Sequence, residues 1–163
     1  MHDLRHLLEH ELKDLYSGES QIISALPKMA EAASHPELRQ AFETHLEQTR
    51  EQARRLEQVA ESLGMSYEGH ECKGMKGILE EGKEILAEKS KGDPDVIDAA
   101  LISAAQRVEH YEMAGYGTAR TLARQLGEKE AAEVLQVILD EEGETDKLLT
   151  RLAESRVNRD AAR

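Results

Sequence analysis

The sequence predicts an all-α fold, and three observations support this prediction. The 163 residues include four Tyr, one Phe and no Trp, so the aromatic residues that favour strands are scarce. Proline occurs only three times, and the helix-favouring residues Ala, Leu, Glu and Arg are abundant. Apolar residues recur at alternating spacings of three and four, which is typical of amphipathic helices. The length fits a single domain that spans residues 1–163.

The first two helices follow from their apolar stripes and from the residues at their ends. The first stripe predicts a helix over residues 3–33. Pro27 lies inside this helix and predicts a kink, because proline removes one helical hydrogen bond. Ser34 and Glu37 have the spacing of a capping box, which opens the second helix. This helix is predicted over residues 36–63, and a glycine follows as its stop signal.

The third and fourth helices form a second pair. Asp93 precedes a proline and is a strong N-cap, so the third helix is predicted over residues 94–126, with Gly127 as its stop signal. The fourth helix follows almost at once and is predicted over residues 129–156. The apolar pattern is lost beyond that point, and the last residues, 156–163, are expected to fray.

The segment between the two pairs, residues 64–93, is a long connection. It holds six of the eleven glycines and a short amphipathic stretch around residues 78–86. Short links within each helix pair and one long link between the pairs predict a ferritin-like four-helix bundle, in which one crossover with its own short helix runs the length of the molecule. The alternative is an up-down-up-down bundle with a flexible insert.

Charge and composition limit the partners and the location of the protein. With 33 acidic and 21 basic residues the formal net charge is -12, which argues against a nucleic acid partner because phosphate binding needs a basic surface. The single cysteine excludes an internal disulfide and favours a reducing cytoplasm. The N-terminal segment has no signal-peptide pattern, and no apolar run is long enough to span a bilayer. We therefore expect a soluble, cytoplasmic protein.

Each predicted helix has a polar interruption in its apolar stripe. In the first helix Glu19 occupies the core position between Leu15 and Ile22. The other interruptions are His45, Thr49 and Gln52 in the second helix, Glu109 and Glu112 in the third, and Glu142 in the fourth. All of them lie near the helix midpoints. Because helices of similar length pack with their midpoints at one level, these side chains are expected to share one layer.

Four carboxylates in one layer need compensation. Each would lose several kcal/mol of solvation free energy on burial, and they would repel one another at low dielectric. Two divalent metal ions would balance the charge of the four glutamates, and carboxylates three residues apart on a helix are well placed to chelate. Alternatively, some carboxyl groups stay protonated in a hydrogen-bonded layer with the polar side chains of the second helix, and this layer fixes the register of the bundle. We favour the metal interpretation.

A family resemblance extends this interpretation. The segments that carry it are HELKDLYSGE, ALPKMAEAA, HLEQTREQ, AAQRVEHYEMAGYGTAR and LDEEGETD. Through them the chain resembles the YciE/YciF family of ferritin-like stress proteins over nearly its whole length. The resemblance implies a homodimer with a di-iron-type site inside the bundle. It implies metal ligands at Glu19, Glu112 and Glu142, with Glu109 as an additional carboxylate.

The sequence also departs from the usual di-iron pattern, which places Glu-x-x-His on the second and fourth helices. These positions are Thr49 and Gln52 on the second helix and Glu142 and Thr145 on the fourth. Both imidazoles and one carboxylate of the pattern are therefore missing. His45 is the only histidine on a core stripe, so it is a candidate ligand, a hydrogen-bond donor to a ligand, or a core residue.

Two tyrosines are further candidates for the site. Tyr16 lies three residues before Glu19, and Tyr116 lies four residues after Glu112. Each is therefore expected on the same helix face as a candidate ligand. There it would hydrogen-bond a carboxylate, carry an electron or fill the core with a polar tip.

These observations predict a ferritin-like stress protein with two divalent metal ions, iron or else manganese, because the donor atoms are mostly oxygens. The predicted activity is a reaction with peroxide or oxygen, which needs a redox-active metal with an open coordination position. The competing hypothesis is a dimeric helical interaction protein, either metal-free or passively metal-binding, whose polar layer is architectural.

Overall fold

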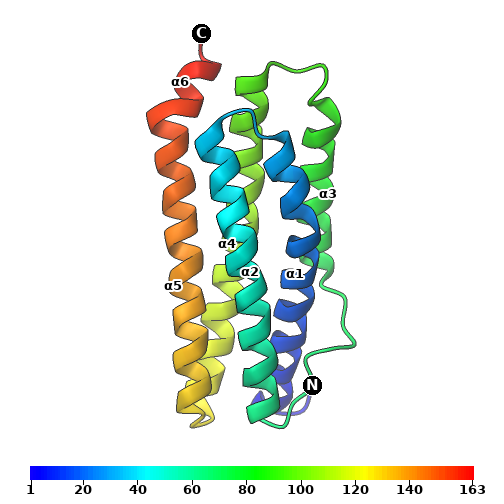
Figure 1. Cartoon of the computed structure of the whole chain (residues 1–163). Helices are drawn as coiled ribbons and strands as arrows, with labels where there is room; N and C mark the ends of the chain where they lie inside the picture. Colours follow the sequence, from blue (N-terminus) through cyan, green and yellow to red (C-terminus); the bar gives the residue numbers. More distant parts are fainter.

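The computed structural model describes residues 1–163 and contains only helices and their connections (Figure 1). The elements are α1 (Leu4–Ala32), α2 (Pro36–Ser62), α3 (Lys73–Glu88), α4 (Pro94–Gln125), α5 (Lys129–Leu152), a π-helical turn (Ala153–Val157) and the short α6 (Asn158–Ala161). The predicted all-α class is confirmed. No helix combines the length and apolar character that crossing a membrane requires.

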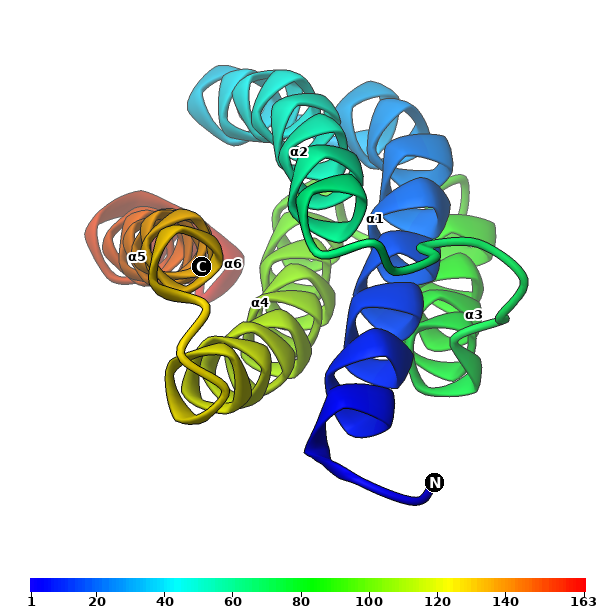
Figure 2. The ribbon, with the colours of Figure 1, turned by 90° about the horizontal axis from the view of Figure 1, so that it is seen from below.

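Four long helices lie side by side, and α3 lies outside them. In Figure 1, α1 rises from the N-terminus, α2 descends beside it, α4 also descends, and α5 rises again. The connection from α2 to α4 therefore returns along the molecule, and α3 forms most of it. Figure 2 shows α3 on the outer side of α1, where it packs against α1 and α4. This order brings one stripe of each long helix to a common interior.

The start of α2 differs from the prediction. The Ser34–Glu37 capping box does not form, and His35 is the N-cap residue instead. The backbone amides of Ser34 and His35 donate to the carboxylate of Asp98 on α4, at 2.8 and 2.7 Å. Asp98 is buried, so this contact ties the turn between α1 and α2 to the start of α4. The local cap is therefore His35, whose Nδ1 accepts from the Glu37 amide at 3.3 Å, and the tertiary contact with Asp98 holds the turn that precedes it.

Other predicted helix ends are confirmed. Gly64 and Gly127 have positive φ angles of 65° and 82°, as a glycine after a helix C-terminus commonly does. Asp93 caps α4 by accepting hydrogen bonds from two backbone amides. Pro27 stays inside α1, which continues to Ala32. The C-terminal segment is more ordered than predicted, because Val157 is buried in the core.

The connecting helix α3 is longer than its amphipathic stretch suggested. Its N-cap is Cys72, whose thiol accepts a hydrogen bond from the amide of Met75. The Cys72 amide donates to Ser17 Oγ at 2.9 Å, and its thiol donates to Asp14 Oδ2 at 3.1 Å. The thiol also lies 3.1 Å from the Tyr111 hydroxyl. The single cysteine therefore anchors the start of α3 to α1 and α4.

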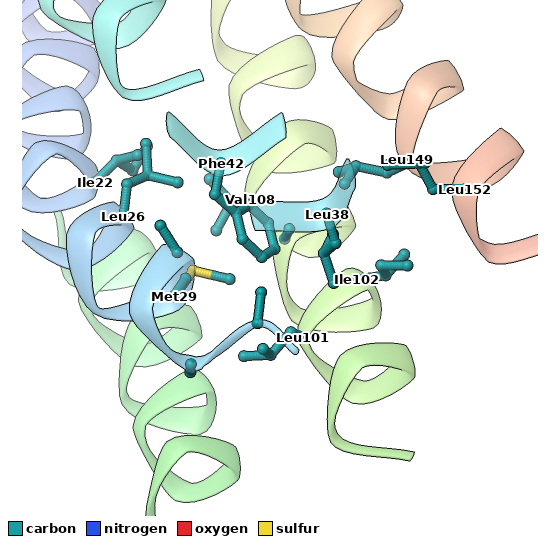
Figure 3. Close-up of a cluster of buried hydrophobic side chains, with 14 of the residues drawn as sticks. Ile22, Leu26, Met29, Leu38, Phe42, Leu101, Ile102, Val108, Leu149 and Leu152 are labelled. Carbon is teal, nitrogen blue, oxygen red and sulfur yellow. The ribbon is translucent and has the colours of Figure 1, made fainter. Parts of the chain in front are cut away.

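The apolar interior consists of two separate clusters. One, which we call the upper cluster, includes Phe42, Leu101 and Leu149 and lies near the top of Figure 1; Figure 3 shows part of it. The other, the lower cluster, includes Leu12 and Leu135. Along each long helix the residues between the two clusters are the polar interruptions that the sequence revealed.

Candidate metal centre

A buried polar layer separates the two apolar clusters. Its seven polar side chains are at most 3% exposed. They are Glu19 from α1, His45, Thr49 and Gln52 from α2, Glu109 and Glu112 from α4, and Glu142 from α5. Each of the four long helices thus contributes to one layer, as expected from the helix midpoints.

Four members of the layer form a compact cluster. One potential ligand atom from each of His45, Glu109, Glu112 and Glu142 lies within 4.8 Å of the others. His45 Nδ1 is 3.3 Å from Glu109 Oε1, and His45 Nε2 is 3.7 Å from Glu142 Oε2. The imidazole therefore lies among the carboxylates. The sequence left open whether His45 is a ligand, a donor to a ligand or a core residue. In the structure its imidazole lies among the candidate ligands.

Most of the polar side-chain atoms in the layer have no hydrogen-bond partner in the protein. Of the nine buried side-chain nitrogen and oxygen atoms without one, eight belong to this layer. They include both carboxyl oxygens of Glu109 and of Glu112, His45 Nε2, and one oxygen each of Glu19 and Glu142. Unpartnered buried polar groups are costly and rare in folded proteins. Their concentration at one level makes this layer fit a cation.

The protonation of the glutamates reflects burial and repulsion. Burial raises the pKa of Glu19, Glu109 and Glu112 well above the usual value, and the negative charge of Glu142 raises all three further. Burial also acts to raise the pKa of Glu142, but the neighbouring His45 and Glu109 side chains and the hydrogen bond from Gln52 outweigh it, so this pKa is lowered. In the absence of cations, the layer therefore holds protons around one carboxylate, that of Glu142.

Gln52 and Thr49 occupy the positions where the di-iron pattern has histidine and glutamate. The Gln52 amide donates to Glu142 Oε1 and, at 3.1 Å, to Glu141 Oε2. Gln52 therefore holds the Glu142 carboxylate in place. Thr49 donates its hydroxyl proton to the backbone carbonyl of His45 at 2.8 Å, within its own helix. On α2 the strongest potential ligand is thus His45, one turn before Thr49 and two turns before Gln52, the position where the pattern has histidine.

The two candidate tyrosines have different environments. Tyr116 is fully buried, and its hydroxyl donates to Glu19 Oε1. Burial and the charge of Glu19 raise the pKa of Tyr116, so its hydroxyl stays protonated as a donor. Tyr16 is not part of the layer: its hydroxyl donates to Glu57 at 2.8 Å, and its ring packs against Tyr67. The expectation that Tyr16 faces the site is wrong, because its side chain extends toward α2 at the molecular surface.

Thr145 lies beside the layer, at the edge of a groove. It is partly buried, and its hydroxyl donates to Gln48 at 3.4 Å, so it bridges α5 and α2. Both residues line a groove of about 350 Å³ between these helices, and His45 lies at the base of this groove. The groove is the side on which the layer lies closest to solvent. No local sequence pattern reveals this groove, because its walls come from α2 and α5, which are far apart in the chain.

We expect the Tyr116→Phe substitution to destabilise the metal-free protein by about 1–2 kcal/mol, because Glu19 loses a buried hydrogen-bond donor. The matched control is Tyr16→Phe, which removes a hydroxyl near the surface and should change the free energy of unfolding by less than about 0.5 kcal/mol. Urea denaturation of both variants in the presence of a chelator measures the difference. Equal losses would contradict the placement of Tyr116 in the layer.

Comparisons with known proteins agree with this structure. Residues 3–162 match the family described as a domain of unknown function, DUF892. The chain is 48% identical to the protein YciF of Escherichia coli (strain K12) over 153 residues, which cover 93% of this chain and 91% of that protein. The crystal structure of the E. coli stress protein YciF superposes with a TM-score of 0.92 at 46% identity, covering 97% of this chain and 99% of that one.

A second solved structure is also similar. It is YcfI of Rhodopseudomonas palustris, for which a structural role is suggested; its TM-score is 0.87 at 39% identity, covering 92% of this chain and 94% of that one. The resemblance to YciF that the sequence motifs indicated is thereby confirmed. The chain belongs to the DUF892 family.

Proposed function

We propose that this chain is a cytoplasmic, ferritin-like stress protein whose four long helices hold a di-metal site in mid-bundle. The observation that carries the proposal is the set of eight unpartnered polar atoms in one buried layer. Two divalent cations would give each carboxylate an opposite charge and each unpartnered atom a partner.

Glu142 is central to the layer, because its charge acts on Glu19, Glu109 and Glu112. His45 lies 3.3 Å from Glu109 and 3.7 Å from Glu142. The two ions would be held by these four glutamates and His45. Tyr116 and Gln52 orient Glu19 and Glu142 by hydrogen bonds.

The donor set indicates which metals suit this site. Carboxylate oxygens with a single imidazole favour iron(II) or manganese(II) over copper, and the absence of thiolates argues against a structural zinc site. Bound iron would supply electrons for the reduction of peroxide or oxygen. The protein's own contribution is to position the carboxylates, to keep the Tyr116 proton on its hydroxyl, and to limit water access to the side of the groove at His45.

The test is a metal titration of untagged protein, so that no affinity tag contributes ligands. We expect about two equivalents of iron(II) to bind without air, and manganese(II) to compete. Protein that is purified with less than one equivalent of metal, and that takes up none, would overturn the proposal. Size-exclusion chromatography of the same sample tests the homodimer that we also propose.

The second candidate function is that of an architectural protein without catalytic metal. The environment of Glu142 favours it, because Gln52 donates a hydrogen bond to this carboxylate and His45 lies 3.7 Å from it, and these contacts hold it in place without ions. Peroxide consumption separates the candidates once metal has been shown to bind. Iron-loaded protein should consume peroxide faster than the Glu142→Ala variant treated in the same way. Equal rates would leave a passive metal binder.

A further inference from the structure

A hollow of about 560 Å³ lies between α1 and α3, and no residue of the polar layer lines it. Its apolar floor comes from three helices. The floor residues are Met29 of α1, Ile78, Leu79 and Leu86 of α3, and Ala104 and Val108 of α4. Those of α3 are only partly buried, and Met75 is the single fully buried residue of that helix. The α3 helix thus spans an apolar space that the protein's own side chains do not fill.

Gly82 helps to keep this space open. It lies in the middle of α3, where a glycine costs about 1 kcal/mol relative to alanine, and it lines the hollow. A Cβ atom built at Gly82 would meet no atom within 4 Å. Packing therefore does not require glycine here, and its φ angle is not positive. A larger side chain at this position would enter the hollow.

The rim of the hollow is positively charged. Lys28, Lys76 and Lys83 line it, whereas Glu71 is its only acidic residue. Lys76 forms an ion pair with Glu71 at 2.8 Å. The other lysine ion pairs of the structure belong to Lys13 and Lys147, so Lys28 and Lys83 have no acidic partner. A local excess of positive charge is notable in a chain with a net charge of -12.

We propose that this hollow binds a medium-chain fatty acid. The alkyl chain would lie on the apolar floor beside Gly82, and the carboxylate would pair with the free ammonium groups of Lys28 and Lys83. The volume lies within the range of small-molecule sites, which are mostly apolar with a few charged groups. The rim selects an anionic head group, and the floor selects an unbranched chain. This inference is independent of the metal centre.

The experiment is a calorimetric titration of the full-length protein with decanoate, below its micelle concentration, and with decanol as the uncharged match. We expect saturable binding of decanoate at least about tenfold tighter than that of decanol. Gly82→Leu should weaken decanoate binding at least about tenfold by filling the hollow. Its matched control, Gly82→Ala, should bind nearly as the wild type does. Both substitutions raise helix propensity, so neither is expected to unfold α3.

Two further variants complete the test. The double substitution Lys28→Met with Lys83→Met should lower decanoate affinity to that of decanol, and Glu142→Gln should leave it unchanged. Absence of saturable binding, or wild-type binding by Gly82→Leu, would overturn the proposal. Equal binding of decanoate and decanol by the wild type would overturn the anionic specificity. Binding that weakens as the protein concentration rises would mean that a second copy covers the hollow, and would also overturn it.

Discussion

Replacing Glu112 by Gln is expected to weaken metal binding at least about 100-fold and, at the same time, to stabilise the metal-free protein by about 1–3 kcal/mol. Both oxygens of Glu112 are buried without a partner, so the side chain is either a metal ligand or a carboxyl that must keep its proton. Keeping a proton at neutral pH on a group with a usual pKa of 4.5 costs about 3 kcal/mol. Glutamine has the same shape and avoids this cost.

The controls for Glu112→Gln separate ligand loss from general effects. Glu133→Gln changes an exposed carboxylate on α5 and should alter neither quantity. Glu142→Gln should also weaken metal binding, but without the gain in stability, because Glu142 has a lowered pKa and accepts hydrogen bonds as a carboxylate. Manganese titration by calorimetry gives the metal affinity, and urea denaturation with a chelator gives the free energy of unfolding of the metal-free protein. Metal affinity of Glu112→Gln equal to that of the wild type would refute the proposed site.

The stability of the metal-free protein is expected to fall as the pH rises from about 5 to about 8. Glu19, Glu109 and Glu112 have raised pKa values in the folded protein, so over this range the folded state retains protons that the unfolded state has released. Each retained proton lowers the free energy of unfolding by about 1.4 kcal/mol per pH unit. Glu142 has the opposite shift, and its stabilising contribution would be lost only in more acidic solution.

Bound metal should remove this pH dependence. With saturating manganese the carboxylates are ligands in their charged form, so stability should rise or stay level over the same range, because protons then compete with the metal. Urea denaturation at several pH values, with manganese and with a chelator, gives both curves. Parallel curves would contradict a cation site in this layer. Without metal, the free energy of unfolding of Glu112→Gln should fall less steeply with pH than that of the wild type. The difference in slope should be about 1.4 kcal/mol per pH unit, because the variant retains one proton fewer.

Much of the fold follows from local patterns. The apolar stripes, Gly64, Asp93 and Gly127 predicted the long helices to within a few residues, because helix periodicity and end signals act over one or two turns. The start of α2 could not be predicted in this way. Its N-cap is His35, and the turn before it is held by Asp98 of α4, a residue far along the chain that no local pattern connects with this turn. The N-terminal extension of α3 was missed because a cysteine is an unusual N-cap.

The site was predictable to a similar degree. Carboxylates on apolar stripes revealed Glu19, Glu112 and Glu142 because burial of a charge is conspicuous in a sequence. The direction of a side chain at the edge of a stripe is less certain. Tyr16 shares a face with Glu19 by spacing, yet its long side chain extends to Glu57. His45 and Glu109 could not be paired from the sequence, because their contact depends on how α2 and α4 rotate about their axes.

The separation of the upper and lower clusters has a mechanical consequence. Each end of the molecule has its own apolar cluster, and the polar layer joins the two. A metal-free protein should therefore open more easily at the polar layer while both ends keep their packing, so mid-helix amide hydrogens should exchange faster without manganese than with it, and those of the two clusters should change less. The centre can then open and re-form without the loss of the whole fold.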